Sequence, residues 1–117
     1  MARDRVWRDG EQAAWNGYRA RGYRLVARNW RCPLGELDLV VARGDVLVFC
    51  EVKARAGGEL GPPFVAVTAA KRRKLRRLAE AFVAAMRPRG VAFRFDVASV
   101  TWHPDGPPAV HVFEDAF

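Results

Sequence analysis

Apolar and polar residues alternate along this chain in blocks, and the period of each block predicts its secondary structure. In the first block apolar residues recur every three or four positions, as on a helix that packs on one side, and Gly22 is a suitable stop. Later blocks are rich in Val, Leu and Phe and alternate as strands do. The pattern predicts a helix at 5–21, strands at 23–30, 34–42 and 46–55, a helix at 68–87, and strands at 91–100 and 109–113.

The breaks between these blocks carry their own signals. Thr68 can cap the second helix, which ends before Pro88 and Gly90. Gly and Pro make 56–63 a loop and 103–108 a turn, and a tight turn at 43–45 would pair two neighbouring strands. The second helix has an apolar stripe at Leu75, Leu78, Ala79, Phe82 and Met86. The order α-β-β-β-α-β-β predicts an α/β core with helices packed on a mixed sheet.

Length and charge narrow the class of protein. The chain has 117 residues, half of them hydrophobic, which predicts a single folded domain over 1–117. Its net charge is +7 and its pI about 10.4, a balance that favours phosphate backbones or acidic surfaces as partners. Genomic composition can also enrich Arg, but Arg remains a good bidentate phosphate binder whatever its origin.

The cysteine, histidine and apolar content argues against a disulfide-rich secreted scaffold, a zinc site and a membrane-spanning segment. Two cysteines do not make a disulfide-rich secreted scaffold. The cysteines and histidines also lack the short paired spacings of a zinc site: Cys32, Cys50, His103 and His111. No apolar stretch approaches membrane-spanning length and the N-terminus has no apolar signal core, so we expect a cytoplasmic protein without a membrane partner.

Two β-prone segments each carry an acid where a buried strand would carry Val or Ile. They place Asp38 on one strand, and Glu51 with Lys53 on the next. Residues two apart on a strand share a face, so Glu51 and Lys53 project together, with Val48, Cys50 and Val52 on the other face. Two carboxylates and an ammonium on one sheet surface indicate a site for Mg²⁺ (or Mn²⁺) with a catalytic lysine.

Each of these residues also has a structural interpretation. Asp38 could be a solvent-facing strand residue, and Lys53 could form a salt bridge to Glu51 or Glu36 without catalytic purpose. We expect Glu36 to point away from Asp38 and not to be a ligand. Glu11 lies on the side of its helix that faces the sheet, where it could join the site or favour the helix dipole.

Asp96 lies between apolar residues, and structural pairing with Arg94 is its favoured interpretation over metal binding. Trp30 could stack on a base, although core packing is the favoured role for a tryptophan.

Basic residues concentrate on the second predicted helix. They are Lys71, Arg72, Arg73, Lys74, Arg76 and Arg77. Charge runs are usually solvated faces, but like charges on one helix repel, and a polyanion would relieve that repulsion. Arg28, Arg31 and Arg55 lie near the predicted site and could contact phosphates.

Several motifs together resemble a known family. Asp38, the thirteen-residue step to Glu51, and the triplet Glu51-Val52-Lys53 resemble the Asp…Glu-X-Lys signature of restriction-endonuclease-like nucleases. Within that superfamily the chain resembles the YraN family of bacterial proteins, whose core resembles archaeal Holliday-junction resolvases. The matching stretches are Gly10-Glu11, Gly22-Tyr23, Arg28-Asn29, Gly35 to Val40, Phe49 to Arg55, Lys71, Arg94 to Val97, and Ala116-Phe117. Cys50 stands where the family is expected to have Val.

The resemblance implies a restriction-endonuclease-like core and metal-dependent hydrolysis of phosphodiester bonds in DNA, including branched DNA. It implies that Asp38, Glu51, the Val52 carbonyl and Glu11 hold Mg²⁺, and that Lys53 orients the attacking water. Resolvase-like relatives act as dimers, so a homodimer is a further expectation. Two alternatives stay open: a non-catalytic nucleic-acid-binding module with a nuclease-like fold, and an adaptor for an acidic protein partner.

Overall fold

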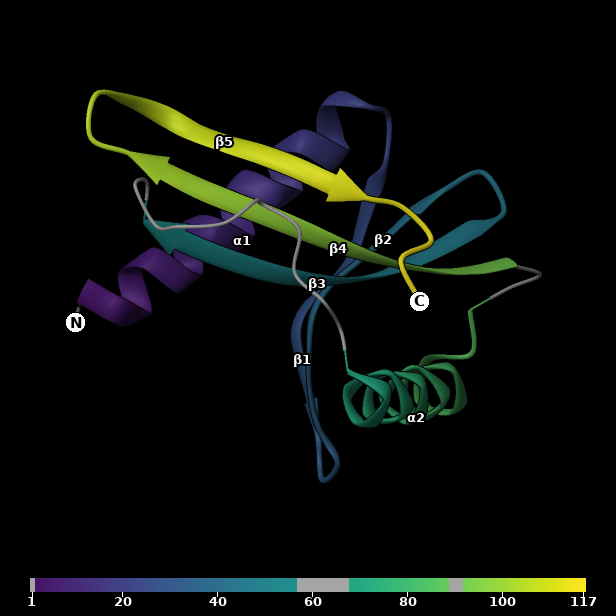
Figure 1. Ribbon diagram of the computed structural model, residues 1–117. Helices are drawn as coiled ribbons and strands as arrows, with labels where there is room; N and C mark the ends of the chain where they lie inside the picture. The colour runs from purple at the N-terminus through teal and green to yellow at the C-terminus, as the bar shows by residue number, and fades with distance from the viewer. Residues whose placement is uncertain (1, 57–67, 89–91) are drawn as a thin grey trace.

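Five strands form one mixed sheet in the order β1-β2-β3-β4-β5 (Figure 1). The computed structural model describes residues 2–56, 68–88 and 92–117, leaving aside the side chains of residues 2–8 and 56. The elements are α1 (Ala2–Ala20), β1 (Arg24–Cys32), β2 (Gly35–Arg43), β3 (Val46–Ala56), α2 (Ala69–Met86), β4 (Ala92–His103) and β5 (Gly106–Phe113). Only β3 and β4 run parallel among these strands. The predicted α/β class and the order α-β-β-β-α-β-β are confirmed.

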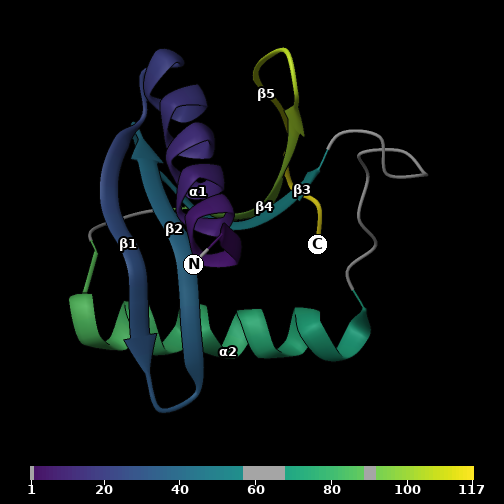
Figure 2. The ribbon, with the colours of Figure 1, turned by 90° about the vertical axis from the view of Figure 1, so that its left-hand side faces the viewer.

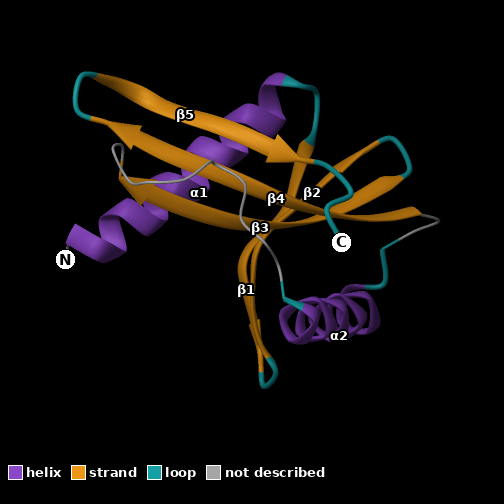
Figure 3. Cartoon of the chain, in the orientation of Figure 1, coloured by secondary structure: helices purple, strands orange, loops and turns teal. Residues whose placement is uncertain are grey.

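The two helices pack on opposite faces of the sheet (Figure 3), and each face has its own apolar cluster. Beneath α1, Ala14 and Tyr18 pack on Leu39, Cys50 and Val52. Beneath α2, residues from both α2 and the strands form the second cluster, which includes Leu47, Phe49, Leu78, Ala79 and Phe82. On β3, Val48, Cys50 and Val52 lie in the first cluster and Leu47 and Phe49 in the second, because side chains alternate across a sheet.

The β2–β3 hairpin forms where the sequence predicts it. Arg43 pairs with Val46, and Gly44 has a φ of 59°, a left-handed conformation that glycine adopts without strain. The β1–β2 hairpin is longer and extends past the sheet to lie across α2 (Figure 2). Trp30 on this hairpin packs edge-on against Phe82 at 5.2 Å between ring centroids, so its expected core role is confirmed.

Local capping follows the sequence signals at both helices. Gly22, with a φ of 88°, donates its N–H to the Arg19 carbonyl and ends α1. The Thr68 hydroxyl accepts the Lys71 N–H at 3.2 Å and starts α2. Both features were predicted, and both place their helices along the sheet.

Two details of the prediction were wrong. Met86 is 53% exposed, because it is the last residue of α2, and Val83 packs against the cluster instead. β4 extends to His103 and β5 begins at Gly106, so the turn between them is shorter than the expected 103–108. Pro107 and Pro108 are tolerated because β5 is an edge strand. The predicted loop at 56–63 falls almost wholly outside the described residues.

Neither helix of the described chain is long and apolar enough to cross a membrane.

Candidate active site

The candidate site lies where β2 parts from β3. Their last register pair is Leu39 with Cys50. Just beyond it, the Asp38 Oδ2 accepts the Val52 N–H at 2.9 Å, so a side chain takes the place of a backbone acceptor. Asp38 therefore sits at an opening in the sheet, reachable from the layers on both sides.

Three carboxylates converge at this opening. Glu11 from α1 and Glu36 and Asp38 from β2 each offer an oxygen, and these oxygens lie within 4.8 Å of one another. Glu11 is only 1% exposed, which places it in the site rather than at a solvated helix end. The expectation that Glu36 points away was wrong, because residues two positions apart on a strand share a face. We call Glu11, Glu36 and Asp38 the acidic cluster.

Glu51 approaches the same region from the α2 side of β3. Its Oε1 lies 2.6 Å from the Lys71 Nζ and 3.6 Å from the Lys53 Nζ. Its Oε2 is buried and has no hydrogen-bond partner among the described residues. Glu51 and Asp38 line one narrow cleft. Glu51 and Lys53 thus share a face as predicted, and Cys50 points into the α1-side cluster.

The electrostatics of Asp38 reflect this crowding. Burial, together with the negative charges of Glu51, Glu11 and Glu36, raises the pKa of Asp38 from 3.8 to about 7, although the Val52 N–H acts in the opposite direction. Ionised Asp38 is therefore poorly compensated by the chain itself. A cation at this opening would favour the ionised form of Asp38 and lower its pKa.

The two lysines around Glu51 differ in their protonation behaviour. Burial and the neighbouring Lys71 lower the pKa of Lys53, outweighing its attraction to Glu51. Burial also lowers the pKa of Lys71, but hydrogen bonds to Glu51 and Lys53 outweigh it and raise the pKa overall. Lys71 thus carries the positive charge against Glu51, and Lys53 is the lysine better suited to exchange a proton.

The donor set fits a hard divalent cation. All the ligand atoms on offer are carboxylate oxygens, the type that Mg²⁺ and Mn²⁺ prefer. The structure brings Glu11 and Asp38 together and sets Glu51 at the same cleft. It adds Glu36 to the expected set, while Val52 reaches Asp38 through its N–H, and the ligand role of its carbonyl stays a prediction.

The predicted phosphate-binding residues surround the site unevenly. The Arg28 Nη1 donates to the Gln12 side chain at 2.8 Å, and the Arg31 Nε lies 3.0 Å from Glu36. The Arg55 Nε donates to Thr101 at 3.4 Å. The remaining predicted contacts are exposed along α2: Arg72, Arg73, Lys74, Arg76 and Arg77. Lys71 on that helix ion-pairs with Glu51. This contact was not predicted from the sequence, where only the position of Lys71 in the first turn of α2 pointed to it.

Asp96, by contrast, is a structural residue, as expected. It is fully buried and accepts bonds from the Arg94 Nε at 2.9 Å and the Tyr18 hydroxyl at 2.7 Å. The Asp115 N–H donates to it as well, at 3.0 Å. Asp96 ties α1, β4 and the C-terminal segment together.

Comparison with known proteins places the chain in a family. The model of the uncharacterised protein family UPF0102 matches residues 10–100, most of the chain. The chain belongs to this family. The UPF0102 match covers every residue of the acidic cluster, both site lysines and Glu51, and it confirms the resemblance to the YraN family.

Relatives match nearly end to end. A UPF0102 protein of Symbiobacterium thermophilum is 47% identical over 97% of this chain and 96% of its own length. A UPF0102 protein of Clavibacter michiganensis is 45% identical over 93% of this chain and 92% of its own length. One from Frankia alni is 42% identical over 99% and 97%. The relationship therefore includes the whole sheet.

Proposed function

We propose that this UPF0102 chain is a metal-dependent endonuclease with a restriction-endonuclease-like core, and that it hydrolyses phosphodiester bonds in DNA, including branched DNA. The observation that carries the proposal is the convergence of Glu11, Glu36 and Asp38 at the parting of β2 and β3. Carboxylates crowded out of water are costly, and here they raise the pKa of Asp38 to about 7. A chain that keeps such a cluster gains from binding a cation there.

Each site residue has a role in this proposal. Asp38, Glu11 and Glu51 would hold the ion, and Glu36 would support it through its position beside Asp38. Mg²⁺ bound there would make a water more acidic and offset negative charge on the phosphate. Lys53, whose pKa is lowered, would orient the attacking water and exchange its proton.

The substrate backbone would approach along α2. Its exposed arginines can form bidentate contacts with phosphates, and such contacts position a nucleic acid without reading its sequence. Lys71 would release Glu51 to the ion and turn to the scissile phosphate, since its Nζ already lies between the helix and the site.

One observation favours the alternative of a binding module without turnover. The ion pair of Lys71 with Glu51, at 2.6 Å, neutralises a proposed metal ligand from within the chain. If that pair persisted in the bound state, Glu51 would not be available for an ion, and α2 would still bind nucleic acid.

The test is cleavage by wild type and Asp38→Asn of labelled four-way-junction, flap, single-stranded and linear duplex DNA, with Mg²⁺, Mn²⁺ or chelator. We expect metal-dependent cutting by wild type and a loss of at least about 100-fold in Asp38→Asn, with DNA binding retained. Asp45→Asn, at an exposed acid in the β2–β3 turn, is the matched control and should cut normally.

Cutting that survives in Asp38→Asn would rule out the assigned site. Binding by both proteins without cutting in any metal would favour the binding module.

A further inference from the structure

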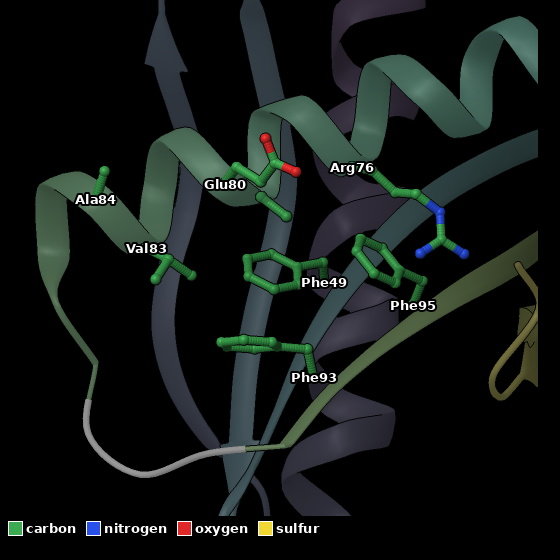
Figure 4. Close-up of a pocket in the computed structure, with 8 residues that line it drawn as sticks. Phe49, Arg76, Glu80, Val83, Ala84, Phe93 and Phe95 are labelled. Carbon is green, nitrogen blue, oxygen red and sulfur yellow. The ribbon is translucent and has the colours of Figure 1, made fainter.

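A second cavity adjoins the candidate site on the α2 face of the sheet (Figure 4). It has a volume of about 370 Å³ and lies between α2 and the paired strands β3 and β4. Its lining is mostly apolar, with Phe49, Phe93 and Phe95 from the strands, and its two charged residues are Arg76 and Glu80 from α2. The stick view shows the rings of Phe49 and Phe93 extending from the strands into the space beneath the helix.

The register of β3 and β4 places this cavity directly next to the site acids. Phe49 is paired with Phe95, and the next pair on the same face is Glu51 with Val97. Two residues along a strand span about 7 Å. Phe49 and Phe95 line both this cavity and the narrow cleft that contains Glu51 and Asp38, so the two spaces adjoin.

The aromatic rings form an open platform. Phe49 and Phe95 stack with centroids 5.5 Å apart and an interplanar angle of 26°, and Phe93 lies 6.1 Å from Phe49. Phe93 is 50% exposed, an unusual state for a phenylalanine on a covered face. The Arg76 guanidinium lies 5.1 Å from the Phe95 ring centroid, at the rim.

We propose that this cavity binds one unpaired nucleobase of the DNA substrate, stacked on Phe93, while Arg76 contacts the adjoining phosphate. The inference rests on the proposed function and specifies its substrate. Aromatic side chains are the usual platforms for unstacked bases, and an arginine beside them supplies the phosphate contact. A single planar base fits within a cavity of about 370 Å³.

Charge selects a nucleotide over an apolar protein segment as the occupant. Arg76 and Glu80 are the charged residues that line the cavity; Arg72 and Arg73 are exposed on α2 one turn before them, and the whole chain has a net charge of +7. An apolar peptide would gain nothing from these arginines, whereas a base attached to phosphates on both sides would use the rings and the charges together.

The position of the cavity predicts which DNA is preferred. A base held at Phe93 and a phosphate held near Glu51 belong to the same strand, close to the cut. In duplex DNA that base would first have to leave its stack, which costs free energy, whereas at a junction, a flap or a bulge it is already unpaired. Phe93 lies four residues, about 13 Å, along β4 from Val97, the register partner of Glu51. The substrate class is therefore DNA with an unpaired base close to the cleaved bond.

The test measures DNA binding in the presence of chelator, where no cleavage occurs. It uses two oligonucleotides that differ only in whether one base is paired. One carries 2-aminopurine as an unpaired bulge, and the other carries it fully paired. We expect wild type to bind the bulged DNA more tightly and to quench its fluorescence. Phe93→Leu, which keeps an apolar side chain but removes the ring, should weaken bulge binding about tenfold, the size of one base–aromatic stack. Binding of paired DNA should not change.

Two further variants make the result specific. Phe93→Trp restores a stacking ring and should restore both affinity and quenching. Leu25→Ala removes an apolar side chain that is 42% exposed on the edge strand β1 and lines neither cavity, and it should behave as wild type.

Equal binding of bulged and paired DNA by wild type and Phe93→Leu would overturn the base pocket and leave the proposed nuclease intact. No binding of either DNA would overturn both. The molecular mass in solution gives a further outcome. If the mass of wild type rises with protein concentration, that of Phe93→Leu does not, and the base is not quenched, the cavity would be assigned to a second copy of the chain.

Discussion

Two aspartates lie on the same sheet, Asp96 fully buried and Asp38 half-buried, and their surroundings differ in almost every respect. Asp96 on β4 is contacted by a guanidinium, a hydroxyl and a backbone N–H. Asp38 on β2 accepts the Val52 N–H and otherwise faces the carboxylates of the acidic cluster and Glu51. Hydrogen bonds from the chain stabilise the Asp96 carboxylate, whereas burial and the nearby acids raise the pKa of Asp38.

This difference separates a structural acid from the acid that we propose to be functional. A buried charge that is fully hydrogen-bonded keeps its place by holding elements together, and its removal leaves partners stranded. A buried charge that is crowded by like charges weakens the fold, and functional sites commonly accept such a cost.

The largest effect should come from removing the satisfied acid. Asp96→Ala strands the Arg94 guanidinium and the Tyr18 hydroxyl, so we expect the free energy of unfolding to fall by about 3–5 kcal/mol. Urea denaturation followed by circular dichroism measures this. Asp105→Ala, at an exposed acid in the β4–β5 turn, should stay within about 0.5 kcal/mol of wild type. A similar small change in Asp96→Ala would remove the contrast between the aspartates.

Replacing Asp38, the acid crowded by other acids, should instead raise the free energy of unfolding. The pKa of Asp38 rises from 3.8 to about 7 on folding, so its stabilising contribution is complete below about pH 4 and is lost as the pH rises to 7. Asp38→Asn, which can still accept the Val52 N–H, should be more stable than wild type by about 1–2 kcal/mol at pH 8. Near pH 4 the two proteins should coincide.

Urea denaturation in chelator at both pH values makes the measurement, and Asp45→Asn serves as the exposed control. A variant less stable than wild type at pH 8 would show that Asp38 is compensated after all.

The smallest effect should come from the ion itself. Mg²⁺ at about ten times its dissociation constant stabilises a folded protein by about 1.4 kcal/mol, which is about 5 °C in midpoint for a domain of this size. At pH 8 we expect such a shift in a thermal melt of wild type and of Asp45→Asn, and none in Asp38→Asn. An equal shift in all three proteins would place the ion away from the acidic cluster.

The sequence predicted most of the fold because its signals were local. Thr68 and Gly22 mark helix ends through their own backbone chemistry, and the alternation around Glu51 assigned faces correctly. The end of α2 was less predictable, since whether Met86 is covered depends on how far the sheet extends beneath the helix.

The site was predicted only in part, because it depends on where two strands separate. Asp38, Glu51 and Glu11 follow from their positions in apolar segments and from family resemblance. Glu36 was excluded by an error of strand parity, and the simple rule that it shares a face with Asp38 would have included it. The aromatic cavity needs the parallel pairing of Phe49 with Phe95, which joins segments far apart in the chain.

Because the candidate site lies where β2 and β3 separate, its set of side chains is complete only when both helices have packed on the sheet. Glu11 reaches Asp38 from α1, while Lys71 reaches Glu51 from α2, so both helices contribute side chains to this opening. A chain whose N-terminal helix has not docked would have an intact sheet and an intact basic helix but an incomplete set of acids. Under the proposed function, such a chain would bind DNA without cutting it, so cleavage would require a docked N-terminal helix.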